Sequence, residues 1–131
     1  MTFRPFNQQR ALYAISILAS FATSAPAQAV GIVWDESRAF ETNAAVASGK
    51  SAEVCGKLSK GQVVVWKFEG DRPLDFNIHY HAGAKVVFPE QRGAVSDASG
   101  ELTVAMDQDY CWMWTNRAGP PARVALKLRL R

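Results

Sequence analysis

The chain has 131 residues, 48% of them hydrophobic, and a formal net charge of +3 from 15 basic and 12 acidic residues. This hydrophobic content excludes an intrinsically disordered chain, because such chains bury too little apolar surface to offset the entropy lost on ordering. Removal of a 29-residue leader would leave 102 residues, which is enough for one hydrophobic core and too few for two. A single domain is therefore expected.

The first 29 residues have the pattern of an export signal. Residues 1–10 contain two arginines and no acidic residue, and residues 11–22 are a continuous run of apolar and small side chains. Ala27-Gln28-Ala29 is the small-x-small sequence that a signal peptidase accepts, and Ala25-Pro26-Ala27 is a second such sequence. The apolar run is shorter than the roughly 20 residues that a transmembrane helix needs. We therefore expect a cleavable helical signal peptide over residues 1–29.

The mature domain is expected over residues 30–131, in the periplasm or outside the cell, with no transmembrane segment. Arg4 and Arg10 lie in the leader, so the mature chain carries a net charge of only +1. A nucleic-acid-binding domain usually has a much stronger basic excess. Nucleic acid is therefore not predicted as a partner.

Short runs rich in Val, Ile, Trp, Phe and Tyr alternate with turn sequences about every ten residues of the mature chain, which is typical of an antiparallel β-sandwich. The predicted fold class is all-β, and a helix is left open only for residues 38–47. The predicted turns are Ser48-Gly49-Lys50, Ser59-Lys60-Gly61, Gly70-Asp71-Arg72-Pro73, Ala82-Gly83, Asp97-Ala98-Ser99-Gly100, Asp107-Gln108-Asp109 and Gly119-Pro120-Pro121.

Alternation of apolar and polar residues predicts which side of each strand faces the core. The residues assigned to the core are Leu74, Phe76, Ile78 and Tyr80; Leu102, Val104 and Met106; and Val124, Leu126, Leu128 and Leu130. Those assigned to the outer face are Asp75, Asn77, His79 and His81, with Arg123, Lys127, Arg129 and Arg131 on the last strand. We expect these basic residues to protect an exposed sheet edge; an acidic partner or anionic lipid is the alternative.

Cys55 and Cys111 are the only cysteines. An even number of cysteines in an oxidising compartment predicts one disulfide between them. Cys55 shares its face with Glu53 and Lys57 and so points outward, which requires Cys111 to point outward too. Its neighbours Tyr110, Trp112 and Trp114 then enter the core. An exposed aromatic stripe is the alternative, although large apolar patches are rarely left bare.

The order of features from Cys55 onward, over about 77 residues, resembles the GOLD domain, the lumenal β-sandwich of secretory cargo receptors, and similar bacterial exported domains. The segments that carry this resemblance are Cys55, Leu58 to Gly61, Val63 to Trp66, Pro73 to Ile78, Gly83 to Val87, Tyr110 to Asn116, and Val124 to Leu130. The resemblance implies a β-sandwich and a protein or lipid partner. It does not extend to trafficking, because the sequence stops directly after the last predicted strand.

His79 and His81 are the only histidines, and they are the candidate metal ligands. Alternate residues of a strand project from one face about 6–7 Å apart at their Cα atoms, a spacing at which two imidazoles can share Cu²⁺ or Zn²⁺. Met113 and Asp75 are candidate third ligands. Because most such sites have three or four protein ligands, we expect a solvated, metal-free pair, with a periplasmic copper- or zinc-binding protein as the alternative.

No catalytic residues are predicted. The sequence contains no G-x-S-x-G elbow, no H-E-x-x-H motif, no phosphate-binding glycine loop and no unpaired cysteine. Glu69, Asp71 and Asp75 cluster near a predicted turn, where we expect them to be solvated. The sequence therefore predicts an exported binding or interaction module, not an enzyme, without a cofactor and with a protein or lipid partner.

Overall fold

A computed structural model describes residues 19–20 and 28–131 of the chain. Its strands are β1 (Gln28–Gly31), β2 (Ala39–Val46), β3 (Ser51–Leu58), β4 (Val63–Ala82), β5 (Lys85–Thr103), β6 (Gln108–Thr115) and β7 (Ala122–Leu130). The all-β class is confirmed, since the described residues include no helix, and the segment left open as a helix forms β2. The described part of the chain thus offers no helix that could cross a membrane.

The predicted signal peptide, residues 1–29, lies almost wholly outside the described residues, so it stays a prediction. Strand β1 begins at Gln28, two residues before the predicted start of the mature domain at Val30. Cleavage at the second predicted site, after Ala27, would leave β1 whole. Cleavage after Ala29 would remove the residues that pair with Ala52 and Glu53 of β3.

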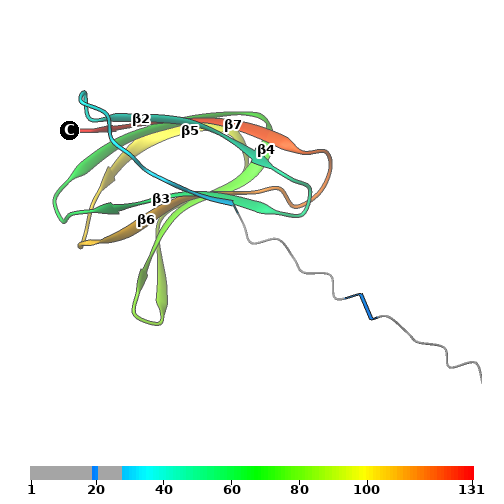
Figure 1. The fold of residues 1–131 in the computed structure, drawn as a ribbon, viewed down its shortest axis with the longest axis horizontal. Helices are drawn as coiled ribbons and strands as arrows, with labels where there is room; N and C mark the ends of the chain where they lie inside the picture. Colours follow the sequence, from blue (N-terminus) through cyan, green and yellow to red (C-terminus); the bar gives the residue numbers. More distant parts are fainter. Residues whose placement is uncertain (1–18, 21–27) are drawn as a thin grey trace, which may run out of the picture.

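All seven strands are hydrogen-bonded into one sheet that curls around the core (Figure 1). The strand order is β1-β3-β6-β4-β7-β2, and β5 pairs with β4. Every pairing is antiparallel except that of β1 with β3, which is parallel. The sequence predicts an antiparallel sandwich of two sheets, whereas the structure is a single curled, mixed sheet.

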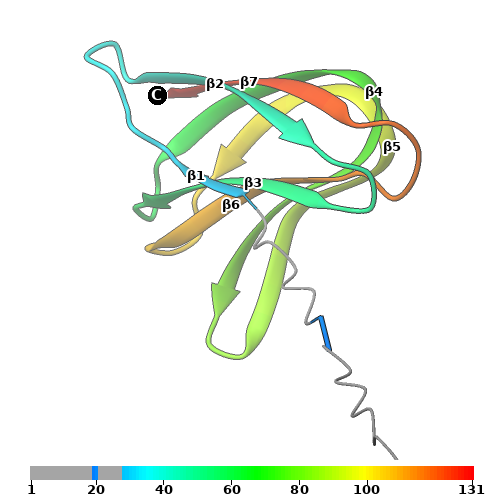
Figure 2. The ribbon, with the colours of Figure 1, turned by 45° about the vertical axis from the view of Figure 1, so that its right-hand side comes forward.

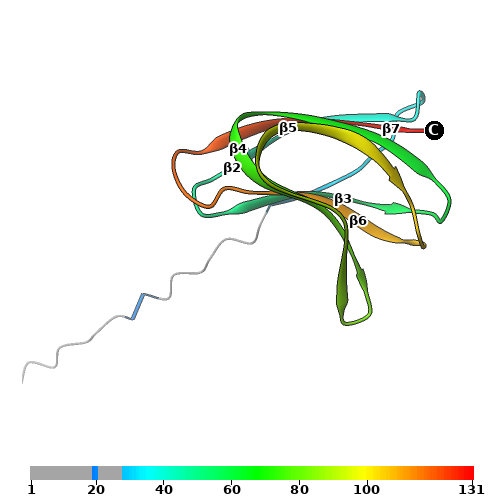
Figure 3. The ribbon, with the colours of Figure 1, turned by 180° about the vertical axis from the view of Figure 1, so that it is seen from behind.

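The long strand β4 explains the curling. Its first half, from Val64 to Gly70, pairs with β7, and its second half, from Asp75 to Tyr80, pairs with β6. Figures 1 and 3 show β4 bending between these halves, where its register with β5 shifts. The turn predicted at residues 70–73 is therefore a bend inside one strand. Glycine is favoured there, because a Cβ at Gly70 would lie only 3.0 Å from the carbonyl oxygen of Ser96.

The turn predicted at residues 97–100 is also wrong, since these residues lie inside β5. Gly100 is directly opposite Trp66 of β4. A Cβ at Gly100 would lie 2.8 Å from Cζ2 of that indole. The glycine therefore makes room for a core side chain rather than for a turn.

The core lies inside the curl and is dominated by aromatic side chains. Phe76 is central, because its ring centroid lies 5.2 Å from that of Trp66, 4.6 Å from that of Phe68 and 5.7 Å from that of Trp114. The inward placement predicted for Tyr110, Trp112 and Trp114 is confirmed, as all three are fully buried. The prediction for Met106 is wrong: β5 ends at Thr103, and Met106 is 41% exposed in the following loop.

The basic last strand is not a sheet edge, because β7 lies between β4 and β2. The expectation that its charges guard an edge is therefore wrong. Lys127 lies 3.7 Å from Glu41 of β2, and Arg131 lies 2.7 Å from Glu101 of β5. These basic residues pair with acidic side chains of neighbouring strands.

The end of β4 and the start of β5 leave the body of the sheet as a projecting hairpin (Figures 1 and 2). The last pair between β4 and β6 is Tyr80 with Tyr110, whereas β4 and β5 remain paired as far as Ala82 with Lys85. We call residues 80–90 the tip hairpin. Beyond Tyr80 its backbone is ordered by the pairing of β4 with β5, without support from β6.

Candidate functional site

The outer face of strands β3, β6 and β4 brings the predicted cysteine and histidine residues together. Cys55 is opposite Cys111 in the pairing of β3 with β6, and Cys111 is opposite His79 in the pairing of β6 with β4. These three residues therefore form a row across adjacent strands. Glu53 and Asn77 lie on the same face, one alternate position along from Cys55 and His79. We call these five residues the outer-face cluster.

The structure contains the predicted disulfide between Cys55 and Cys111, with their Cα atoms 4.1 Å apart. Both residues lie on the outer face, as predicted, and Cys111 is only 9% exposed. The bond joins neighbouring strands that are already paired by their backbones. In this form neither sulfur is a thiolate, so neither can act as a metal ligand.

His79 is buried, with 6% of its surface exposed, so the predicted solvated pair is wrong for this residue. Its Nδ1 lies 2.8 Å from Oδ1 of Asn77. Because an amide oxygen only accepts hydrogen bonds, Nδ1 carries the proton and Nε2 carries the lone pair of the neutral ring. Nε2 lies 3.9 Å from Oε1 of Glu53. The ring of Phe88, from the tip hairpin, packs 5.9 Å away.

Burial lowers the pKa of His79 below its usual value of 6.5. The carboxylate of Glu53 opposes this shift, while the nearby His81 adds to it. The buried imidazole is therefore neutral at pH 7. A neutral imidazole is the form that binds metal ions.

The other predicted ligands are less well placed. His81 is exposed, although its ring centroid is 5.5 Å from that of His79. Met113 shares the outer face, since it is opposite Asn77 in β4 and Glu53 in β3. Asp75 is held at the far end of the face, where it accepts hydrogen bonds from Arg117 and from the backbone N–H of Ala94. The hydrogen bond from Arg117 lowers the pKa of Asp75 below its usual 3.8.

Glu53 was not among the candidate ligands predicted from the sequence. It was assigned to the same face as Cys55, but its closeness to His79 depends on the strand order, in which β6 separates β3 from β4. The alternation of side chains along one strand carries no information about the order of strands in the sheet. The only signal in the sequence was the position of Glu53, which lies two residues before Cys55 and on the same face of the strand.

The three carboxylates near the bend of β4 do not form a catalytic pair. Glu69 lies 3.0 Å from Nζ of Lys67, and Asp71 accepts a hydrogen bond of 2.9 Å from the backbone N–H of Arg123. Asp75 is bound to Arg117. Each carboxylate therefore has its own separate partner, whereas general acid–base catalysis needs groups that converge on one reacting atom.

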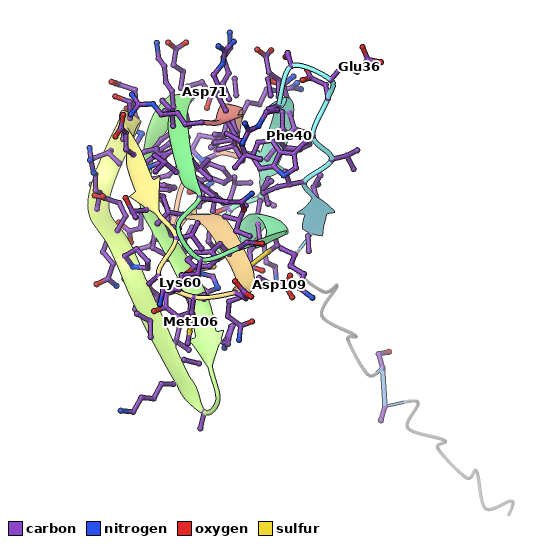
Figure 4. The ribbon with its side chains drawn as sticks, turned by 90° about the vertical axis from the view of Figure 1, so that its left-hand side faces the viewer. Glu36, Phe40, Lys60, Asp71, Met106 and Asp109 are labelled. Carbon is purple, nitrogen blue, oxygen red and sulfur yellow. A yellow bond between two sulfur atoms is a disulfide. The ribbon has the colours of Figure 1, made fainter. Side chains whose placement is uncertain are left out.

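The tip hairpin carries exposed apolar side chains. Val86 and Phe88 are each 43% exposed. Figure 4 shows Met106, which is 41% exposed, with Lys60 and Asp109 at the end of the molecule from which the hairpin projects. Apolar groups bordered by charged residues on a projecting element are typical of protein-binding surfaces.

Comparison with protein-family profiles finds no match, and no curated protein sequence matches the chain. Solved structures do match. PliG of Aeromonas hydrophila, a periplasmic inhibitor of g-type lysozyme, aligns over 79% of this chain and 96% of its own, with a TM-score of 0.61 and 13% identity. The likeness is one of fold.

Two further solved structures show the same likeness of fold. PliG of Salmonella Typhimurium aligns over 79% of this chain and 98% of its own, with a TM-score of 0.58 and 8% identity. The pre-peptidase C-terminal domain of collagenase from Bacillus anthracis aligns over 83% of this chain and all of its own, with a TM-score of 0.57 and 7% identity. The β-rich fold implied by the GOLD resemblance is confirmed, but none of these structures is a GOLD domain, so that family stays a prediction.

Proposed function

We propose that the chain is an exported, non-catalytic protein that binds another protein through its tip hairpin. The observation that carries this proposal is the projection of the hairpin beyond β6 with Val86 and Phe88 exposed. The PliG structures support a protein partner, since they are described as inhibitors of an enzyme. Their periplasmic location, the predicted leader and the disulfide support a place in the periplasm or outside the cell.

A paired hairpin suits the binding of a concave surface. Its backbone is already fixed by the hydrogen bonds between β4 and β5, so little conformational entropy is lost when a partner binds. Aromatic side chains that enter a pocket commonly carry much of the binding energy of an interface. Phe88 is the aromatic residue that the tip presents, and Val86 is the second apolar contact. Since the PliG structures are inhibitors of g-type lysozyme, an enzyme of that class is the first partner to test.

Paired substitutions test the proposal. Immobilised mature protein is compared with the variant Val86→Ala/Phe88→Ala and with the control Val33→Ala. Val33 is 77% exposed and lies in the loop between β1 and β2, outside the tip hairpin. The readouts are inhibition of a g-type lysozyme and retention of proteins from the exported fraction. We expect the double variant to remain folded and to weaken binding by at least about tenfold, and the Val33 variant to bind normally.

Equal binding by the wild type and both variants would exclude the tip hairpin as the contact. Binding of a protein that depends on the hairpin, without any inhibition of lysozyme, would keep the proposed surface and reject the lysozyme class. Loss of binding in the Val33 variant alone would place the contact at the loop between β1 and β2.

A further inference from the structure

We propose that the thiol form of this protein binds one zinc-type metal ion through Cys55, Cys111, His79 and Glu53. This inference concerns the outer-face cluster and is independent of the function proposed for the tip hairpin. It differs from the metal site considered as the alternative in the sequence, because it replaces the exposed His81 with the two sulfur atoms and Glu53.

The donor atoms are already close in the disulfide form. One ligand atom each from Glu53, Cys55 and Cys111 lie within 4.8 Å of one another. The two carboxylate oxygens of Glu53 reach toward different donors: Oε2 lies 3.9 Å from Sγ of Cys55, and Oε1 lies 3.9 Å from Nε2 of His79. Glu53 therefore lies between the sulfurs and the imidazole, and all four residues belong to three adjacent strands of one sheet.

His79 has the environment of a metal-binding histidine. Its Nδ1–H is held by Asn77 at 2.8 Å, which fixes the ring and leaves the Nε2 lone pair directed toward Glu53. Metal-bound histidines almost always donate such a hydrogen bond from the nitrogen that does not bind the metal. This bond sets both the tautomer and the ring orientation. The burial of His79 also removes water as a competing partner.

Two thiolates, an imidazole and a carboxylate are the donor types that tetrahedral zinc sites use. In the disulfide form the sulfurs are bonded to each other, and only His79 and Glu53 remain as donors. Two ligands leave the other coordination positions to water, which gives weak binding. The redox state of the cysteine pair therefore decides whether the complete site exists.

The disulfide form must be reduced to give the thiol form, and a dithiol is a suitable reductant. The dithiol gives two electrons to the bond between Cys55 and Cys111 and becomes a disulfide, and its two protons pass to the cysteine sulfurs. Binding of the divalent ion then displaces both protons into solvent, since thiolates are the ligands. A newly exported chain, in which both cysteines are still thiols, reaches the same state without a reductant.

Metal binding would change which strands are cross-linked. The disulfide joins β3 to β6 only. The metal ion would join these strands to β4 as well, because His79 belongs to β4. His79 is also one residue before the start of the tip hairpin. The outer-face cluster would thus hold the base of that hairpin in the thiol form.

Cobalt(II) provides a direct test, because thiolate ligation gives it a charge-transfer absorption and tetrahedral geometry gives it intense visible bands. The mature protein is reduced with a dithiol, desalted without oxygen, and titrated with Co²⁺ and then with Zn²⁺. We expect one equivalent to bind to the thiol form, with both spectral features, and no such features in the disulfide form. His79→Ala should weaken binding at least about tenfold, whereas the matched variant His81→Ala should bind as the wild type does.

Three results would overturn the proposal. These are the absence of a thiolate charge-transfer band in the thiol form, binding that His79→Ala leaves unchanged, and equal losses in the His79 and His81 variants. Folding is followed by the fluorescence of the buried tryptophans. If the thiol form is unfolded without metal, one equivalent of Zn²⁺ must restore the native emission, and a chain that stays unfolded with Zn²⁺ also refutes the site.

Discussion

At the scale of single residues, the burial of His79 predicts a pH dependence of stability in the disulfide form. The pKa of His79 is lowered in the folded chain, so near pH 6.5 the unfolded chain binds more protons than the folded one. Stability therefore falls as the pH drops through the unfolded pKa of about 6.5 toward the lower folded value. Glu53 and His81 are the ionisable groups that act on His79.

Urea unfolding at pH values on either side of this window measures the effect. We expect His79→Gln to lose the decrease in the free energy of unfolding, and His81→Gln to keep it. The pKa values of Asp35 and Asp75 are lowered below 3.8, by hydrogen bonds from the Ala39 N–H and from Arg117 respectively. Their contributions to stability are lost only at more acidic pH, so they do not overlap with the pH window of His79. A decrease of the same size in both histidine variants would contradict this account.

Gly100 gives a second prediction at this scale. Gly100→Ala would place a Cβ 2.8 Å from the indole of Trp66, which is a buried core side chain with 1% of its surface exposed. Overpacking of this kind usually costs about 1–3 kcal/mol. The matched variant is Gly93→Ala in the same strand, where the nearest atom to the new Cβ is a side-chain oxygen of Asp75 at 3.8 Å. Thermal unfolding should show a loss for Gly100→Ala only; equal melting temperatures would refute the packing role of this glycine.

At the scale of elements, the disulfide is expected to stabilise the pairing of β3 with β6. Closing a loop between residues separated by 56 positions is expected to stabilise the fold by about 4 kcal/mol in the chain-entropy account. Cys55→Ser and Cys111→Ser should each lose this contribution, and the double variant should lose no more than either single variant, since all three lack the same bond. Chemical denaturation measures this, and a double variant markedly less stable than both single ones would contradict it.

The strands and their inward faces were predictable because alternation depends only on local sequence. Tyr110, Trp112 and Trp114 entered the core as predicted, once the outward parity of Cys55 was applied to Cys111. The two failures at turns have one physical cause. Gly70 and Gly100 allow close approach of a carbonyl oxygen and of an indole, respectively, and a sequence pattern does not distinguish this use of glycine from a turn.

The candidate sites were predictable only in part, because they depend on contacts between strands. His79 and His81 were placed on one face, but alternation could not show that Phe88 and the tip hairpin bury only the first of them. Glu53 reaches His79 across β6, and its role required the strand order. The turn of the tip hairpin at Ala82-Gly83 was predicted, but its projection was not, since nothing local shows that pairing with β6 stops at Tyr80 while β4 continues.

At the scale of the whole molecule, the single curled sheet has three distinct regions. The inside of the curl holds the aromatic core, and the outer face of β3, β6 and β4 holds the cysteine and histidine cluster. The tip hairpin projects beyond the sheet (Figure 1), and its Phe88 packs against His79 of that cluster. Substitutions at the tip can therefore change binding without disturbing the core. This separation is what makes the central claim, that the tip hairpin binds a protein, testable by itself.

The most direct measurement is photo-cross-linking of the protein in the cells that produce it. A photoreactive amino acid is placed at Val86 in one variant and at Val33 in another, because both positions are exposed and only the first lies on the tip hairpin. The account predicts an adduct with a protein of defined mass from position 86 and none from position 33. No adduct from position 86, or the same adduct from both positions, would contradict it.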